Sequence, residues 1–264
     1  MKELRIIAHI PEEYVPLKIS SLFILHSSLK SFLGEIKMKY ENMVEGRFIN
    51  RPNRFIANVE INNKIEVCHV KNTGRCRELL IPGKSIVYVQ HNNNPNRKTK
   101  YSLITVKKGD RLINMDSQVP NKVVYEFIKS GKMFEGASLI KPEKTYKNSR
   151  FDLYVEQGDK KIFIEVKGVT LEEDGVVRFP DAPSVRAVKH VNELCECIKE
   201  GYEAYIVFVI QMKDVLYFEP NVKTQKEFAE VLKKAKKRGV NILAFDCNIK
   251  EDSIEICSEV EVRV

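Results

Sequence analysis

The chain has 264 residues, of which 43% are apolar and 30% are charged, a balance typical of a globular protein and unlike a disordered or fibrous one. Its formal net charge is +8, which favours a polyanionic partner, nucleic acid first and a membrane surface second. A basic protein without such a partner is the alternative. The length allows two modest domains or one large one.

Residues 1–43 form an extension whose status the sequence leaves open. The stretch 15–33 is its most apolar part, but Lys18, His26 and Lys30 interrupt it. These charged and polar residues argue against a membrane span there. No basic start leads into an uninterrupted apolar run and a small-residue cleavage site, so we expect no secretory signal. The six cysteines contain no Cys-x-x-Cys pair, so they fit neither a zinc site nor a disulfide framework. We expect free thiols and a cytoplasmic location, with no membrane association.

Residues 44–112 are predicted to form a small β-barrel. The segments RFIANVEI, KIEVCHV, SIVYVQ and SLITVKK are rich in β-branched residues, and turn signals such as Pro82-Gly83 separate them. Several short strands at close spacing, without a long helix between them, favour a barrel. Arginines are interleaved with aromatic residues here, as in platforms for single-stranded nucleic acid; they include Arg51, Arg54, Arg75 and Arg77. The alternative is that the aromatic residues are core and the charges a solvated face.

Residues 113–264 alternate between helical and strand patterns. Asn121 is a candidate cap for a helix through KVVYEFIKS, and further helices are expected from Pro183 to Glu200 and over 224–238. The run AYIVFVIQ at 204–211 is almost continuously apolar, as a strand covered on both faces is. This alternation predicts an α/β layer with a partly parallel sheet.

A hairpin at 150–167 is the main candidate for a functional site. If Gly158-Asp159 forms its turn, cross-strand partners have numbers that sum to 317. One face then carries only apolar pairs, beginning with Phe151 and Val166. On the other face Asp152 lies opposite Glu165, and Lys167 shares that face because it follows Glu165 by two residues.

Two directly opposed carboxylates repel each other, and a bound cation would turn the repulsion into attraction. Carboxylates with water or substrate oxygens suit Mg²⁺ or Mn²⁺, and Lys167 is placed to reach an attacking water or a phosphate oxygen. Asp152 and Glu165 are therefore candidate metal ligands and, with Lys167, candidate catalytic residues. The alternative is a solvated hairpin in which Arg150 and Lys167 neutralise the acids.

Two further clusters favour phosphate contacts. Arg186 and His190 are four apart at the start of one helix and share a face. Asn72 lies in a turn-forming HVKNTG segment, and the arginines that follow, Arg75 and Arg77, favour an anion there. A surface pair without a task and a purely structural turn are the respective alternatives.

The spacing of Asp152 and Glu165-Val166-Lys167 resembles the PD-(D/E)XK nuclease signature, although Phe151 replaces its proline. A wider stretch, roughly 44–249, resembles the sugar fermentation stimulation protein A family. The segments that carry this resemblance are EGRFINRPNRF, CHVKNTGRCRELLIPG, DSQVPN, NSRFDLYVE, FIEVKGVTL and FPDAPSVRAVKHVNEL.

This resemblance implies an N-terminal OB-like barrel and a C-terminal PD-(D/E)XK nuclease-like α/β domain that binds DNA. It also implies that an acid on the helix before the hairpin completes the metal site. Glu126 is the candidate, while Glu135 and Glu143 also precede the hairpin. The first hypothesis is a Mg²⁺-dependent DNA nuclease linked to regulation of sugar metabolism. The alternatives are a DNA-binding regulator that keeps the fold without turnover, and an RNA-binding protein that uses the barrel. Strand preference and oligomeric state stay open.

Overall fold

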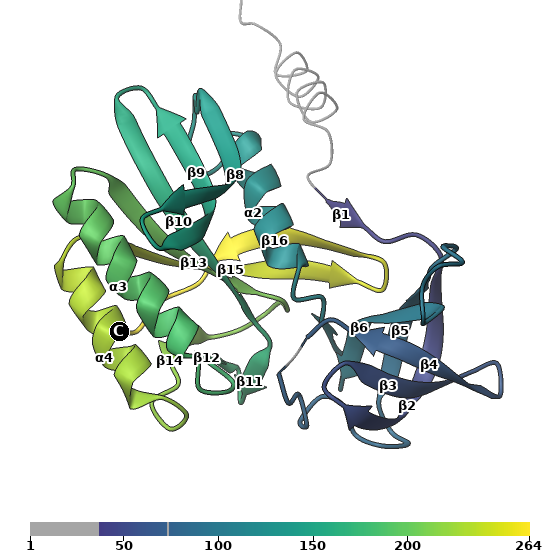
Figure 1. The fold of residues 1–264 in the computed structure, drawn as a ribbon. Coiled ribbons are helices and arrows are strands. Elements are labelled where there is room, and N and C mark those ends of the chain that lie inside the picture. The colour runs from purple at the N-terminus through teal and green to yellow at the C-terminus, as the bar shows by residue number, and fades with distance from the viewer. Residues whose placement is uncertain (1–36, 73) are drawn as a thin grey trace, which may run out of the picture. The chain divides into compact units, whose positions relative to one another are not determined.

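The computed structural model describes residues 37–72 and 74–264 (Figure 1). The predicted extension therefore lies outside the described residues as far as residue 36. The elements of the first part are β1 (Met38–Lys39), β2 (Met43–Asn53), β3 (Ile56–Ile61), β4 (Lys64–Val70), β5 (Ile86–His91), β6 (Tyr101–Lys108) and β7 (Arg111–Asn114). Those of the second part are α2 (Val119–Lys129), β8 (Leu139–Tyr146), β9 (Ser149–Gln157), β10 (Lys160–Val169), β11 (Leu171–Glu173), β12 (Val176–Phe179), α3 (Val185–Lys199), β13 (Glu203–Ile210), β14 (Tyr217–Pro220), α4 (Lys226–Lys237), β15 (Asn241–Lys250) and β16 (Ser253–Glu259).

The first part is a closed barrel, as predicted. Its strands follow the order β4-β3-β2-β5-β6-β7, and a parallel pairing of β4 with β6 closes five of them into a ring. Alternate residues of β3 (Ala57, Val59 and Ile61) point into the barrel core and are buried, whereas the residues between them are half-buried. The period-2 pattern of the sequence thus sets which side of the strand faces inward.

The second part is an α/β domain, also as predicted. Its seven-stranded sheet has the order β1-β16-β15-β13-β10-β9-β8, in which β10, β13 and β15 run parallel. Helix α2 contacts one face of the sheet, and α3 and α4 cover the other (Figure 1). Side chains of β13 alternate between the two apolar cores, with Ile206 and Phe208 on the α3 side and Val207 on the α2 side. A strand buried on both faces needs the continuous apolar run seen in the sequence.

The three predicted helices begin at residues other than those predicted. Helix α2 starts at Val119 after the cap position Gln118, so Asn121 lies in its first turn and is not the cap. Helix α3 starts at Val185, and the Ser184 side chain accepts a hydrogen bond from the Ala187 amide. Pro183, the predicted start, lies outside the helix. Helix α4 starts at Lys226 with Gln225 at the cap position, two residues after the predicted start at 224. None of the helices in the described residues is long and apolar enough to span a membrane.

The hairpin of β9 and β10 has the predicted register. The pairs run from Gln157 with Lys160 to Leu153 with Ile164, so their numbers sum to 317. The ladder ends before Asp152. The placement of Phe151 was wrong, because its ring lies 5.4 Å from that of Phe163 on the α3 side, away from the core beneath α2. Glu143 of β8, between the partners of Leu153 and Phe151, has a positive φ.

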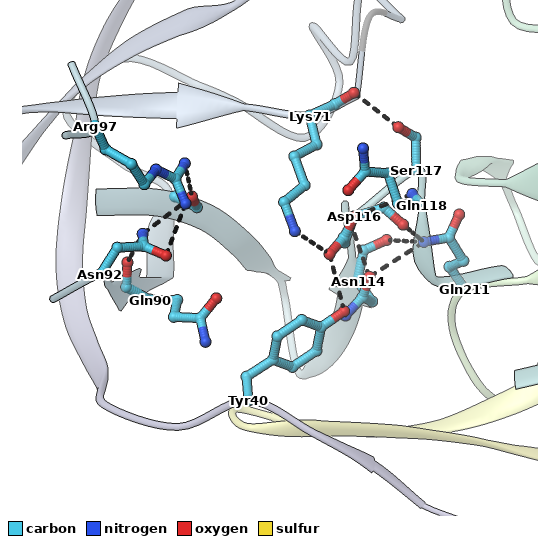
Figure 2. A network of polar contacts seen from close by, with 11 residues as sticks. Tyr40, Lys71, Gln90, Asn92, Arg97, Asn114, Asp116, Ser117, Gln118 and Gln211 are labelled. Atoms are coloured by element: carbon cyan, nitrogen blue, oxygen red, sulfur yellow. Dashed lines mark hydrogen bonds and ion pairs between the residues drawn. The ribbon is translucent and has the colours of Figure 1, made fainter. Parts of the chain in front are cut away.

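A buried polar network joins the barrel to the α/β domain (Figure 2). The chain leaves β7 through Asn114 and Asp116, and Asp116 accepts hydrogen bonds from Lys71 at 2.5 Å and from Tyr40 at 3.3 Å. From the other side, the Gln211 amide donates to the carbonyl oxygens of Asn114 and Asp116, both at 3.0 Å. The connection between the two parts is thus a packed, hydrogen-bonded segment.

Candidate metal and nucleic-acid site

Asp152 lies where the ladder between β9 and β10 ends, and two different elements hold its carboxylate. Its Oδ2 accepts a hydrogen bond from the Val166 amide at 2.8 Å, and its Oδ1 accepts one from the Asn121 side chain at 2.7 Å. Asn121 is in the first turn of α2, so the start of that helix fixes the carboxylate against β10. The sequence predicts Asn121 only as a helix cap, whereas in the structure its side chain holds Asp152.

Glu165 is 1% exposed and receives two cationic or polar partners on one oxygen. Lys167 and the Nδ1 atom of His190 both bond to Oε1. Its other oxygen, Oε2, is buried and has no hydrogen-bond partner among the described residues. A buried carboxylate oxygen without a partner is energetically costly, so this atom is the natural point for a ligand.

The two carboxylates are close enough to influence each other's ionisation. Burial raises the pKa of Asp152, and the neighbouring Glu165 charge raises it further. Burial alone would also raise the pKa of Glu165, but the bonds from His190 and Lys167 outweigh it, so this pKa is lowered. Glu165 is therefore held as a carboxylate, and the negative charge next to Asp152 persists.

Helix α3 contributes the remaining side chains near Glu165. His190 is 5% exposed, and its Nε2 atom lies 3.4 Å from the Nε atom of Arg186, whose side chain is exposed. The sequence predicts that both residues share one helical face and contact phosphate. The structure instead puts His190 against a carboxylate and leaves Arg186 at the surface.

The acids proposed to complete the site lie elsewhere. Glu126 is exposed on α2, beyond the turn that carries Asn121. Glu135 is exposed and offers its backbone carbonyl to Gln157. Glu143 is exposed on β8, 3.5 Å from Arg150. The side chain that reaches Asp152 from α2 is that of Asn121.

In the barrel, Arg51 is occupied by the protein itself. Its guanidinium donates hydrogen bonds of 2.7–3.1 Å to four backbone carbonyls, those of Arg54, Asn72, Gly74 and Arg75. The Asn72 side chain accepts the Gly74 amide at 2.8 Å, as a turn residue does. These two residues shape the loop, whereas the side chains of Arg54, Arg75 and Arg77 are exposed and can meet an anion.

The residues present fit a divalent cation in part. Among the described residues, no group of three histidine, cysteine, aspartate or glutamate side chains is placed to hold a metal ion. Asp152 and the unpartnered Oε2 of Glu165 nonetheless offer two hard oxygen donors. Mg²⁺ is commonly held by one or two carboxylates, with water and substrate phosphate completing its shell. These two carboxylates are oxygen donors of the kind that Mg²⁺ or Mn²⁺ takes.

The closed barrel and the α/β sheet with its Asp…Glu-x-Lys hairpin define a two-domain protein of OB and α/β type. Residues 49–115 match the family model described as the SfsA N-terminal OB domain, and residues 118–253 match the sugar fermentation stimulation protein RE domain. The chain belongs to the sugar fermentation stimulation protein family.

Relatives match over nearly their whole length. A sugar fermentation stimulation protein homolog of Clostridium beijerinckii is 65% identical over 225 residues, covering 85% of this chain and 99% of the relative. One of Ruminiclostridium cellulolyticum is 60% identical over 227 residues, covering 86% and 100%. The solved structure of Pyrococcus furiosus SfsA in complex with Ca²⁺ is 31% identical with a TM-score of 0.79, covering 86% of this chain and 98% of that one.

Proposed function

We propose that this protein binds DNA and cleaves phosphodiester bonds with the help of a divalent cation held by Asp152 and Glu165. The observation that carries the proposal is the buried Oε2 atom of Glu165, which has no hydrogen-bond partner among the described residues. The pKa of a second carboxylate, Asp152, is raised by burial and by the charge of Glu165. A cation would relieve both costs.

The residues of the chain have distinct roles in this proposal. Asp152 and Glu165 would hold Mg²⁺ or Mn²⁺, which supplies charge neutralisation at a phosphate and lowers the pKa of a bound water. Asn121 and the Val166 amide orient Asp152. Lys167 is held on Glu165, where its ammonium group can stabilise negative charge on a phosphate oxygen or orient a water.

The charge distribution supports DNA as the partner. The net charge is +8, and the exposed arginines of the barrel include Arg54, Arg75 and Arg77. The Pyrococcus furiosus structure is described as a complex with Ca²⁺, a hard cation that binds oxygen ligands like those here. The name of the family supports a link to sugar fermentation, and the free cysteines Cys68, Cys76, Cys195, Cys197, Cys247 and Cys257 support a cytoplasmic place of action.

The second candidate is a DNA-binding regulator without turnover. The bond between Lys167 and Glu165 favours it, because a lysine bound to the metal-ligand carboxylate is partly withdrawn from chemistry. Both candidates predict DNA binding, and they differ in cleavage.

The test is incubation of the purified protein with single- and double-stranded DNA in Mg²⁺, in Mn²⁺ and in EDTA, with binding measured in parallel. Asp152→Asn and Lys167→Ala are the site variants. Lys160→Ala serves as the control, since it removes the same charge from the exposed end of β10. Cleavage that requires metal and is lost in both site variants, with DNA binding kept, supports the nuclease. Binding without cleavage in every metal favours the regulator, and equal cleavage by all variants shows a contaminant.

A further inference from the structure

His190 connects the candidate metal ligand to an exposed arginine. It is buried on α3, where its ring packs against Phe151 with centroids 6.2 Å apart. Its two nitrogens have different partners: Nδ1 bonds to Glu165 Oε1, and Nε2 faces the Arg186 Nε–H at 3.4 Å. Arg186, His190 and Glu165 thus form one chain of contacts from the surface to the buried carboxylate.

The partners decide where the ring proton lies. The Nε atom of an arginine always carries hydrogen, so Nε2 of His190 acts as the acceptor in the contact with Arg186. The ring proton is then on Nδ1, which donates it to Glu165 Oε1. This bond occupies one oxygen of Glu165 and leaves Oε2 for another ligand. Side chains that orient metal ligands in this way are common around metal sites.

Arg186 carries a charge that the described part of the chain does not neutralise. Its side chain is exposed and forms no ion pair with a described carboxylate, although its Nε is directed by His190. Lys189, on the same helix, differs because it bonds to the Asn148 carbonyl at 3.0 Å and lies 3.8 Å from Glu193. An exposed guanidinium whose Nε–H contacts a buried histidine suits binding of a phosphate.

We propose that Arg186 binds a DNA phosphate beside the metal site and that His190 is a positioning residue, which orients Glu165 with one nitrogen and Arg186 with the other. This inference rests on the proposed function. Through His190, the binding of a phosphate by Arg186 would be coupled to the orientation of the metal ligand Glu165. A strand bound by Arg186 would be placed next to the oxygen that Glu165 presents to the cation.

The first test measures metal affinity without catalysis, by calorimetric titration of the full-length protein with Mn²⁺. His190→Phe keeps the ring that packs on Phe151 but removes the hydrogen bonds, and we expect it to lower Mn²⁺ affinity by about 10–100-fold. His190→Asn places an amide donor where Nδ1 was, and we expect its Mn²⁺ affinity to stay close to that of the wild type. Circular dichroism and thermal melts without metal confirm that each variant is folded.

The second test measures DNA affinity as a function of salt concentration, in EDTA so that no cleavage occurs. Arg186→Ala should reduce the slope of log K against log salt by about 0.9 for a duplex, the value for one lost phosphate contact. Lys189→Ala removes the same charge from the same helix and should leave the slope unchanged.

The outcomes separate this inference from the proposed function. If the wild type binds no Mn²⁺, both fail. If the wild type binds Mn²⁺ but a folded His190→Phe variant binds it equally well, the positioning role of His190 is refuted while the metal site stands. If Arg186→Ala leaves the slope unchanged, or if Lys189→Ala changes it as much, Arg186 is not a specific phosphate contact.

Discussion

Replacing Gly168 by alanine should destabilise the protein strongly, although Gly168 lies on a strand and has an ordinary backbone conformation. A Cβ atom there would lie 2.5 Å from Gln211 Oε1 and 2.9 Å from Pro120 Cγ. Gln211 is 2% exposed and is held by hydrogen bonds of 3.0, 3.1 and 3.0 Å to Asn114 and Asp116. Pro120 is a rigid ring in the first turn of α2, so neither neighbour can move away freely.

The cost has two sources. Forcing an extra methyl into a packed site costs about 1–3 kcal/mol. If Gln211 turns away, at least one buried acceptor is left without its donor, which costs about 1–3 kcal/mol more. We therefore expect Gly168→Ala to lower the free energy of unfolding by about 2–6 kcal/mol, or Tm by roughly 4–24 °C for a chain of this size.

Thermal and urea unfolding followed by circular dichroism measure this effect. In a Gln211→Ala background most of the clash is absent, so Gly168→Ala should cost much less there, and the double-mutant cycle isolates the contact. A Gly168→Ala variant within about 0.5 kcal/mol of the wild type, the range of ordinary surface substitutions, would refute the reasoning. So would an equal cost in both backgrounds.

Two other predictions concern charged groups at the barrel. Burial alone would raise the pKa of Glu172, but Lys108, the Gly175 amide and Arg111 outweigh it, so its pKa is lowered. The contribution of ionised Glu172 to the free energy of unfolding is therefore present above the unfolded pKa of about 4.3 and is lost as pH falls through the folded pKa. In urea unfolding, Glu172→Gln should lose less stability than the wild type as pH falls below about 5. An unchanged pH profile would contradict this. Arg51→Ala should lower stability by about 2–4 kcal/mol, since its hydrogen bonds to four carbonyls are lost, and Arg51→Lys should not restore it because one ammonium group cannot replace the fork. The salt dependence of DNA binding should not change in either Arg51 variant, and a slope reduced by about 1 would show that Arg51 contacts a phosphate instead.

Much of the fold follows from local pattern. The turn at Gly158-Asp159 fixed the register of the hairpin, because a two-residue loop allows one alignment that keeps both faces consistent. The continuous apolar run of β13 indicated a central strand. By contrast β2, whose sequence MVEGRFINRPN contains glycine, proline and several polar residues, was not recognised as a strand. Its pairing with β3 and β5 comes from tertiary contacts that local propensity does not express.

The candidate site was predictable only where it depends on register. The hairpin register predicts Asp152, Glu165 and Lys167 as candidate residues, but the observed ladder ends at Leu153 and Ile164, so the placing of Asp152 is not set by that register. The contacts of Asn121 with Asp152 and of His190 with Glu165 depend on how α2 and α3 pack against the sheet. The role of Arg51 could not be predicted from the sequence. An arginine that binds backbone carbonyls has the same kind of sequence neighbours as an arginine at the surface.

The polar network around Asp116 has a consequence for how such proteins evolve. The two family models divide the chain between residues 115 and 118, which places the boundary inside this network. The network includes Tyr40, Lys71, Asp116 and Gln211. Each of them forms a hydrogen bond with a residue from another part of the chain. Grafting a foreign barrel onto this α/β domain would strand unpaired polar groups at the junction. The two halves are therefore expected to be inherited together, with substitutions on one side of the junction matched by substitutions on the other.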